Sequence, residues 1–171
     1  SEITDYAEIS GEAIIKDNVC VGGKSRIWDS VILSGYVKVN GRALIREHAE
    51  LYDHVIIADS VEVAGNAKVK DNVVLSGCCL VSDNTKISGN ARVTDYARIY
   101  SHVQIRGNAY VGGMATLTGG VCICENGQVD GNLVLSGDSI VKGNTRICTQ
   151  DEADKIFKPS VFNNMSNENS L

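Results

Sequence analysis

The stretch "SGNARVTDYARIYSHVQIRGNAYVGG", residues 88–113, places a large aliphatic side chain at every sixth position. Val93, Ile99, Ile105 and Val111 mark the period, and Ile87 stands six residues before the first of them. A period of six fits neither an α-helix, which repeats every 3.6 residues, nor a plain strand, which repeats every two. The stretch therefore predicts a short structural unit that is used again and again.

The same period runs from Ile3 to Ile147, and each of its twenty-five positions is Ile, Val or Leu. A second series lies two residues before each large residue, and its members are small or apolar and never charged. Side chains two residues apart lie on the same side of a strand. Because 22% of the chain is charged, fifty uncharged positions at fixed spacing predict one shared interior.

A turn is expected after each large residue. The second position after it is almost always Asp or Gly, and the third is often Asn, as at Asn18, Asn66, Asn72, Asn84, Asn90, Asn108, Asn126, Asn132 and Asn144. Asn and Gly tolerate left-handed backbone better than other residues do. The sequence thus predicts alternating short strands and corners, with the coil closing after three strands.

These repeats resemble the hexapeptide-repeat family, whose members form left-handed parallel β-helices with three strands per coil. The resemblance implies an all-β fold in which residues 1–149 form about eight coils from uninterrupted hexapeptides. Its handedness is implied by the resemblance alone. The "GNAxVxDxAxI" texture is most similar to uncharacterised bacterial and phage members of the family.

Residues 150–171 are expected to cap the last coil with a helix and a tail. Thr149 to Glu152 reads as a capping box, residues 153–157 continue a short helix, and Pro159 ends it. The first coil has no such lid, although strand edges at the end of a solenoid need cover. A partner subunit or protein, an upstream domain and a polar first coil are three ways to supply it.

Composition narrows the class of protein. A net charge of −5 argues against general nucleic-acid binding. No apolar run has the length of a membrane helix, so no membrane association is expected. Six cysteines without a framework pattern favour a reducing, cytoplasmic setting over disulfides, and they suggest no metal site.

One outer face of the predicted prism is basic in its middle, beside a column of asparagines at the adjacent corner. A bland interpretation is a solvated face next to an asparagine ladder that satisfies corner backbone groups. A functional interpretation is an anion site for the phosphates of CoA or a nucleotide, formed by Lys68, Lys70, Lys86, Arg106, Asn90 and Asn108.

A second outer face carries Ile56 and Val74 on neighbouring coils, among small residues. Members of the family are commonly homotrimers that pack along their prisms, and the resemblance implies such an interface here. Scattered surface aliphatics, however, need no explanation of this kind.

The resemblance implies several activities, among them acyl transfer from acyl-CoA, which requires a histidine base near a cleft between subunits. The candidates are His102, His48 and His54, all at predicted corners, and no loop is extruded from the coil to bind an acceptor. The three-histidine zinc site of the related carbonic anhydrases is not reproduced. Cys122 and Cys124 point two thiols outward from one strand, without a third or fourth ligand.

The leading functional prediction is a non-enzymatic β-solenoid that binds or scaffolds, phage-related in origin and without a cofactor. The alternative is a CoA-dependent acyltransferase that acts at a subunit interface.

Overall fold

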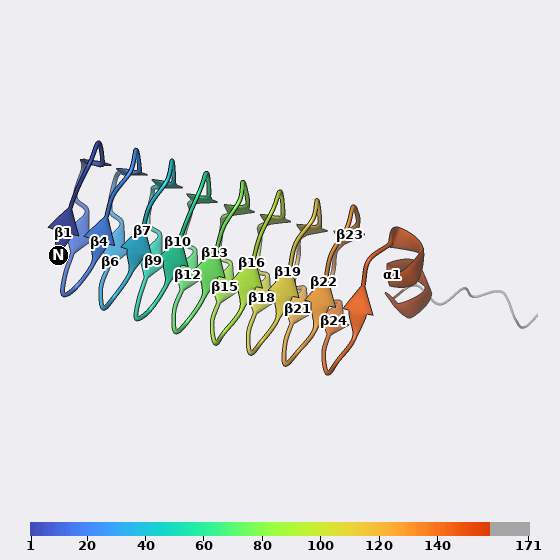
Figure 1. Cartoon of the computed structure of the whole chain (residues 1–171). Coiled ribbons are helices and arrows are strands. Elements are labelled where there is room, and N and C mark those ends of the chain that lie inside the picture. Colours follow the sequence, from blue (N-terminus) through green and yellow to red (C-terminus); the bar gives the residue numbers. More distant parts are fainter. Residues whose placement is uncertain (158–171) are drawn as a thin grey trace, which may run out of the picture.

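The computed structural model describes residues 1–157. Within this range the chain forms twenty-five strands of two residues each and one helix (Figure 1). Every strand ends on one of the large aliphatic residues of the six-residue series. The period in the sequence is therefore the period of the strands.

The strands form three parallel sheets, which we call A, B and C. Sheet A consists of β1 (Glu2–Ile3), β4 (Cys20–Val21), β7 (Lys38–Val39), β10 (Ile56–Ile57), β13 (Val74–Leu75), β16 (Arg92–Val93), β19 (Tyr110–Val111), β22 (Gln128–Val129) and β25 (Arg146–Ile147). Sheet B consists of β2 (Glu8–Ile9), β5 (Arg26–Ile27), β8 (Leu44–Ile45), β11 (Glu62–Val63), β14 (Leu80–Val81), β17 (Arg98–Ile99), β20 (Thr116–Leu117) and β23 (Val134–Leu135). Sheet C consists of β3 (Ile14–Ile15), β6 (Ile32–Leu33), β9 (Glu50–Leu51), β12 (Lys68–Val69), β15 (Lys86–Ile87), β18 (Gln104–Ile105), β21 (Cys122–Ile123) and β24 (Ile140–Val141).

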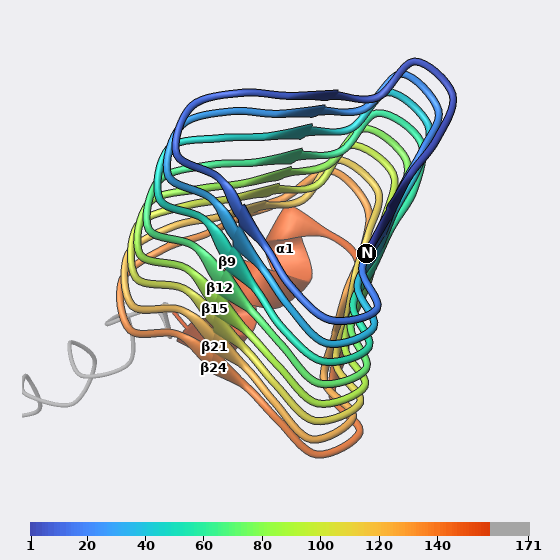
Figure 2. The same ribbon diagram turned by 90° about the vertical axis from the view of Figure 1, so that its left-hand side faces the viewer.

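Successive coils stack without any shift in register. Glu2 pairs with Cys20 and Ile3 with Val21, and the offset of 18 residues holds in every later pair. Viewed along its axis the molecule is a three-sided tube (Figure 2). This confirms the predicted left-handed parallel β-helix of about 8 turns.

The interior is aliphatic, as predicted. From Val21 to Ile147 no large residue of the six-residue series is more than 2% exposed. The ends differ from the prediction, because Ile3 is 54% exposed and Ser1 and Thr145 are exposed as well. Ser1 and Ile3 belong to the first coil and Thr145 to the last, so no further coil stacks on them. A side chain that points inward is buried only where coils lie on both sides of it.

The corners use left-handed backbone at the second position after each large residue from Ile3 to Val141, where Asp and Gly dominate. Among the non-glycine residues described, positive φ falls on Asp, Glu and Ser rather than on the asparagines that follow. The carboxylates also link the coils. For example, the Gly77 amide donates to Asp59 Oδ2 at 3.0 Å, and the Ser101 amide donates to Asp83 Oδ2 at 2.8 Å.

The asparagines form a ladder at the corner between sheets C and A. Each side-chain amide donates to the carbonyl oxygen of the asparagine one coil further on, at 3.0 to 3.1 Å, from Asn72 through Asn90, Asn108 and Asn126 to Asn144. The predicted column is confirmed, but these asparagines bind one another rather than the corner backbone.

Helix α1 (Gln150–Phe157) covers the end of the last coil (Figures 1 and 2). The predicted capping box is confirmed, because the Glu152 amide donates to Thr149 Oγ1 at 3.2 Å and the Thr149 amide donates to Glu152 Oε2 at 3.3 Å. Ala153 is buried against the core. Pro159 and the predicted tail lie outside the described residues. Of the helices in residues 1–157, none is long and apolar enough to cross a membrane.

Candidate functional site

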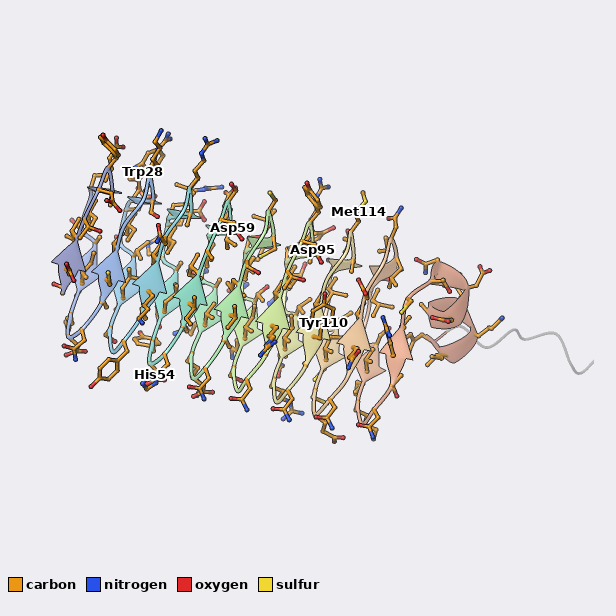
Figure 3. All side chains as sticks on the ribbon, in the orientation of Figure 1. Trp28, His54, Asp59, Asp95, Tyr110 and Met114 are labelled. Carbon is orange, nitrogen blue, oxygen red and sulfur yellow. The ribbon has the colours of Figure 1, made fainter. Side chains whose placement is uncertain are left out.

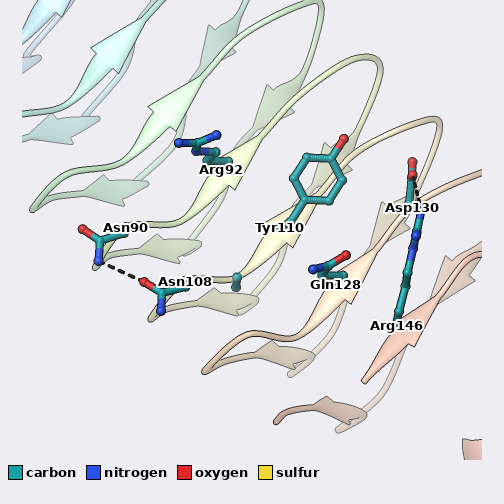
Figure 4. Close-up of a pocket in the computed structure, with 8 residues that line it drawn as sticks. Asn90, Arg92, Asn108, Tyr110, Gln128, Asp130 and Arg146 are labelled. Atoms are coloured by element: carbon teal, nitrogen blue, oxygen red, sulfur yellow. Dashed lines mark hydrogen bonds and ion pairs between the residues drawn. The ribbon is translucent and has the colours of Figure 1, made fainter. Parts of the chain in front are cut away.

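A shallow groove of about 430 Å³ lies on the outer face of sheet A (Figure 4). Its strands belong to the half of the prism nearer α1 (Figure 1). Its walls come from four neighbouring strands, β16, β19, β22 and β25, and from the corner that precedes them. The lining residues are Asn90, Arg92, Asn108, Ala109, Tyr110, Gln128, Asp130 and Arg146.

The register of sheet A explains why these residues meet. Arg92 pairs with Tyr110, Tyr110 with Gln128, and Gln128 with Arg146. Each is the first residue of its strand, and the second residue of each strand is buried in the core. Because side chains alternate along a strand, all four point outward in one row, the Arg92 row.

The Arg92 row carries two positive charges and no negative charge. Arg92 is exposed and forms no ion pair with any side chain in residues 1–157. Arg146 pairs with Asp130, with 3.6 Å between Nη2 and Oδ2, and both side chains remain partly open to solvent. The groove thus contains two guanidinium groups and one carboxylate, so an anionic ligand is electrostatically favoured.

Tyr110 forms the apolar part of the groove and is held from two sides. Its hydroxyl lies 3.0 Å from Thr94 Oγ1, within hydrogen-bonding distance. Its ring lies over Gly112, where an added Cβ would come within 2.7 Å of the ring carbon Cζ. A side chain at position 112 would displace the ring.

The groove can therefore bind an anion through guanidinium groups and a flat apolar group against an aromatic ring. Arginine presents its donors in a planar fork that matches phosphate and carboxylate oxygens. A tyrosine ring offers apolar contact area with a polar end. Gln128 adds an amide between the two arginines in the register.

The basic face predicted from the sequence lies on sheet C, next to the groove rather than in it. Lys68 and Lys86 are paired in register. Lys68 is engaged by Glu50, with 2.9 Å between Nζ and Oε2, and the Tyr52 hydroxyl donates to the same carboxylate at 2.7 Å. Salt bridging of Lys68 reduces its capacity to bind an external anion.

Asn90 and Asn108 are the two predicted ligand residues that do line the groove. They stand at the corner shared by sheets C and A, and so they border both faces. Lys70, Lys86 and Arg106 project from sheet C, on the other side of this corner.

Arg92, Tyr110 and Arg146 were missed by sequence reasoning. The sequence indicates their proximity only by their spacing: Tyr110 follows Arg92 by 18 residues, and Arg146 follows Tyr110 by 36, so all three stand at the same position of different coils. Nothing in that spacing separates them from other outward positions. What distinguishes this part of the surface in the structure is the space beside Gly112, which the Tyr110 ring occupies.

None of the three histidines lines the groove. His48 and His102 follow β8 and β17 at the corner between sheets B and C, three coils apart. His54 stands at the asparagine corner (Figure 3). Its ring stacks on Tyr36, with centroids 4.9 Å apart and planes 5° from parallel. A single subunit therefore does not bring a histidine to the groove.

The predicted interface residues occupy the same outer row as the groove. Ile56 pairs with Val74 and Val74 with Arg92, so the apolar pair leads directly into the Arg92 row. Ile56 is 42% exposed and Val74 is partly buried. In residues 1–157, no three His, Cys, Asp or Glu side chains are grouped so as to hold a metal ion.

No protein-family model matches the chain, and no curated protein matches it either. Several solved structures are similar to it, among them the following three. The UDP-N-acetylglucosamine acyltransferase of Francisella novicida is 14% identical, over 81% of this chain and 62% of its own length, with a TM-score of 0.38. A hexapeptide transferase family protein from Anaplasma phagocytophilum is 17% identical, over 84% and 74%, with a TM-score of 0.29. The UDP-N-acetylglucosamine O-acyltransferase of Moraxella catarrhalis is 18% identical, over 91% and 75%, with a TM-score of 0.38.

The chain thus spans less than two thirds of the length of the first of these proteins. The likeness concerns repeat architecture. The three-sided coil and parallel sheets define the chain as a left-handed β-helix protein. Its strands recur every six residues along the chain.

Proposed function

We propose that the chain binds a phosphate-bearing small molecule in the groove on sheet A, and that this binding serves acyl transfer from CoA. The observation that carries the proposal is the Arg92 row, in which Arg92 lies next to a tyrosine ring held in place by Gly112 and Thr94, and Arg146 lies two strands beyond that ring. Acyl-CoA combines phosphate groups with an aromatic adenine, and this chemistry suits the row.

A purely structural scaffold explains the groove less well. Binding another protein requires complementary surface, but it does not require an unpaired arginine beside an aromatic ring in a hollow. Concave sites with a few convergent polar groups are typical of small-molecule binding. The groove therefore favours a ligand-binding role over the scaffold.

Acyl transfer also needs a general base within reach of the acceptor. Since no histidine lines the groove of one subunit, the base would come from a neighbouring subunit. A homotrimer packed along sheet A through Ile56 and Val74 would cover the adjoining groove. His102, His48 and His54 are the candidates for that role, since all three are exposed corner residues.

The binding step is tested by calorimetric titration of the chain with CoA. We expect Arg92→Gln to raise the Kd about tenfold, because a hydrogen bond to a charged group contributes about 1.5 kcal/mol. Arg98→Gln is the matched control, since Arg98 is an exposed arginine at the equivalent position of a strand in sheet B. Equal affinity in Arg92→Gln and the wild type would overturn the assignment of the groove.

The transfer step is tested separately, by chromatographic detection of free CoA released from acetyl-CoA with amine and hydroxyl acceptors. Release that is lost in His102→Ala, His48→Ala or His54→Ala would support the transferase and identify its base. Tight CoA binding without release for any acceptor would contradict the transferase and leave a ligand-binding solenoid.

A further inference from the structure

Two cysteines on sheet C point to the same side of one strand. Cys122 and Ile123 form β21, Cys124 follows directly, and Ile123 is wholly buried. Because Ile123 points inward, the thiols on either side of it both point outward. Both are free; Cys122 is half-buried and Cys124 is 7% exposed.

Cations flank this pair on both neighbouring coils. β18 pairs with β21 so that Gln104 faces Cys122, and Arg106 therefore lies beside Cys124. On the other side Ile140 faces Cys122, and Lys142 directly follows that strand, in register with Cys124. Interaction with Cys122 raises the pKa of Arg106, in agreement with this register.

The other cysteines lack this arrangement. Cys78 and Cys79 are consecutive, so they point to opposite sides; Cys78 is exposed and Cys79 is buried in the core. Cys20 and Cys148 stand at opposite ends of sheet A. Within residues 1–157, Cys122 and Cys124 are the two thiols that share a face of one strand.

We infer that Cys122 and Cys124 form a two-thiolate binding site for a soft monovalent cation, Cu(I). Thiolates select Cu(I), Zn²⁺ and iron–sulfur clusters. Structural zinc and iron–sulfur sites need four protein ligands, whereas Cu(I) accepts two. A Cu(I) ion held by two thiolates carries one net negative charge, and Arg106 and Lys142 are placed to balance it.

Binding is a proton exchange without any change in oxidation state. Two Cu–S bonds form, two S–H bonds break, and both protons pass to the solvent. The positive charge of Arg106, beside Cys124 in the register, favours the thiolate form of the pair.

The test is an anaerobic competition between the full chain and the Cu(I) chelator bicinchoninate, with ascorbate as reductant. We expect the wild type to retain one Cu(I) per chain. Cys122→Ser and Cys124→Ser should each lower the affinity at least tenfold, whereas Cys78→Ser and Cys148→Ser should leave it unchanged. Arg106→Gln should lower it about tenfold, as is typical for removal of a residue that supports metal ligands.

X-ray absorption of the copper-loaded chain should show two sulfur ligands. Four results would overturn the inference: no copper retained by the wild type, equal losses in the Cys78 control, an unchanged affinity in both cysteine variants, or a loaded species with twice the mass of the free chain. Circular dichroism of each variant distinguishes a lost site from a lost fold.

Discussion

The ring of Tyr110 lies over Gly112, in the space that a side chain at position 112 would fill. Tyr110 begins β19 and Gly112 directly follows that strand. Because they are two residues apart, they face the same side of sheet A. The hydrogen-bonding contact with Thr94 holds the far end of the ring. The shape of the groove thus depends on an absent side chain as much as on those present.

Gly112→Ala is expected to push the Tyr110 ring out of its place and weaken CoA binding about fivefold, with a loss of about 1 kcal/mol. Since φ of Gly112 is not positive, the backbone itself should accept alanine. Calorimetry measures the change, with Ser76→Ala as control in the same column of small residues. An unchanged Kd in Gly112→Ala would show that the position of the ring does not matter for the ligand.

Thr85 is 0% exposed, and its buried hydroxyl has no hydrogen-bond partner in the described structure. Thr85→Val replaces this hydroxyl by a methyl group and should raise the free energy of unfolding by about 1 kcal/mol. Denaturant titration measures it. Ser25→Ala should show the opposite sign, because the Ser25 hydroxyl donates to the Gly22 carbonyl at 2.7 Å.

Asp59 combines a left-handed backbone, with φ of 64°, and a side chain that accepts the Gly77 amide. Asp59→Gly keeps the backbone and loses the hydrogen bond, so a cost of about 1 kcal/mol is expected. Asp59→Ala loses the same hydrogen bond and also places a residue that disfavours left-handed backbone at this corner, so it should cost about 1 kcal/mol more. Thermal unfolding of the two variants should rank them in this order; an equal cost would mean that the conformation is not strained for alanine.

Tyr52 should make the fold sensitive to alkaline pH. Burial, with the hydrogen bond to Glu50, raises the pKa of Tyr52 from 10.0 to about 12. Below pH 10 the phenol is protonated in both states, and between pH 10 and 12 the unfolded chain loses its proton first. The free energy of unfolding should therefore fall over this range, and less so in Tyr52→Phe than in the control Tyr96→Phe.

Sequence reasoning predicted the fold closely because the interior repeats a strict rule. Each coil places uncharged residues of similar size at the same two positions of every hexapeptide. The large residues from Val21 to Ile147 are therefore all buried in the same way, and the pattern at one of them predicts the next. The corners and the Thr149 capping box follow from local residue types, which the sequence displays directly.

The candidate site was harder to predict, because outward positions obey no such rule. Lys68 looked free in the sequence, yet Glu50 stands 18 residues earlier and neutralises it. Arg92 and Arg146 lie 54 residues apart, and only the stacking of coils places them in one row. Counting by whole coils could have found both relationships, but the hollow over Gly112 requires the position of the Tyr110 ring.

Because the offset between coils is always 18 residues, each coil adds the same length to the prism and presents its faces in the same directions. Removing one complete coil, such as residues 66–83, would shorten the distance between the first coil and the groove while leaving every face in its direction. Removing a single hexapeptide would instead turn everything downstream by one third of a revolution. Insertions and deletions in whole coils are thus the changes of length that such a chain can accept while its surfaces stay aligned.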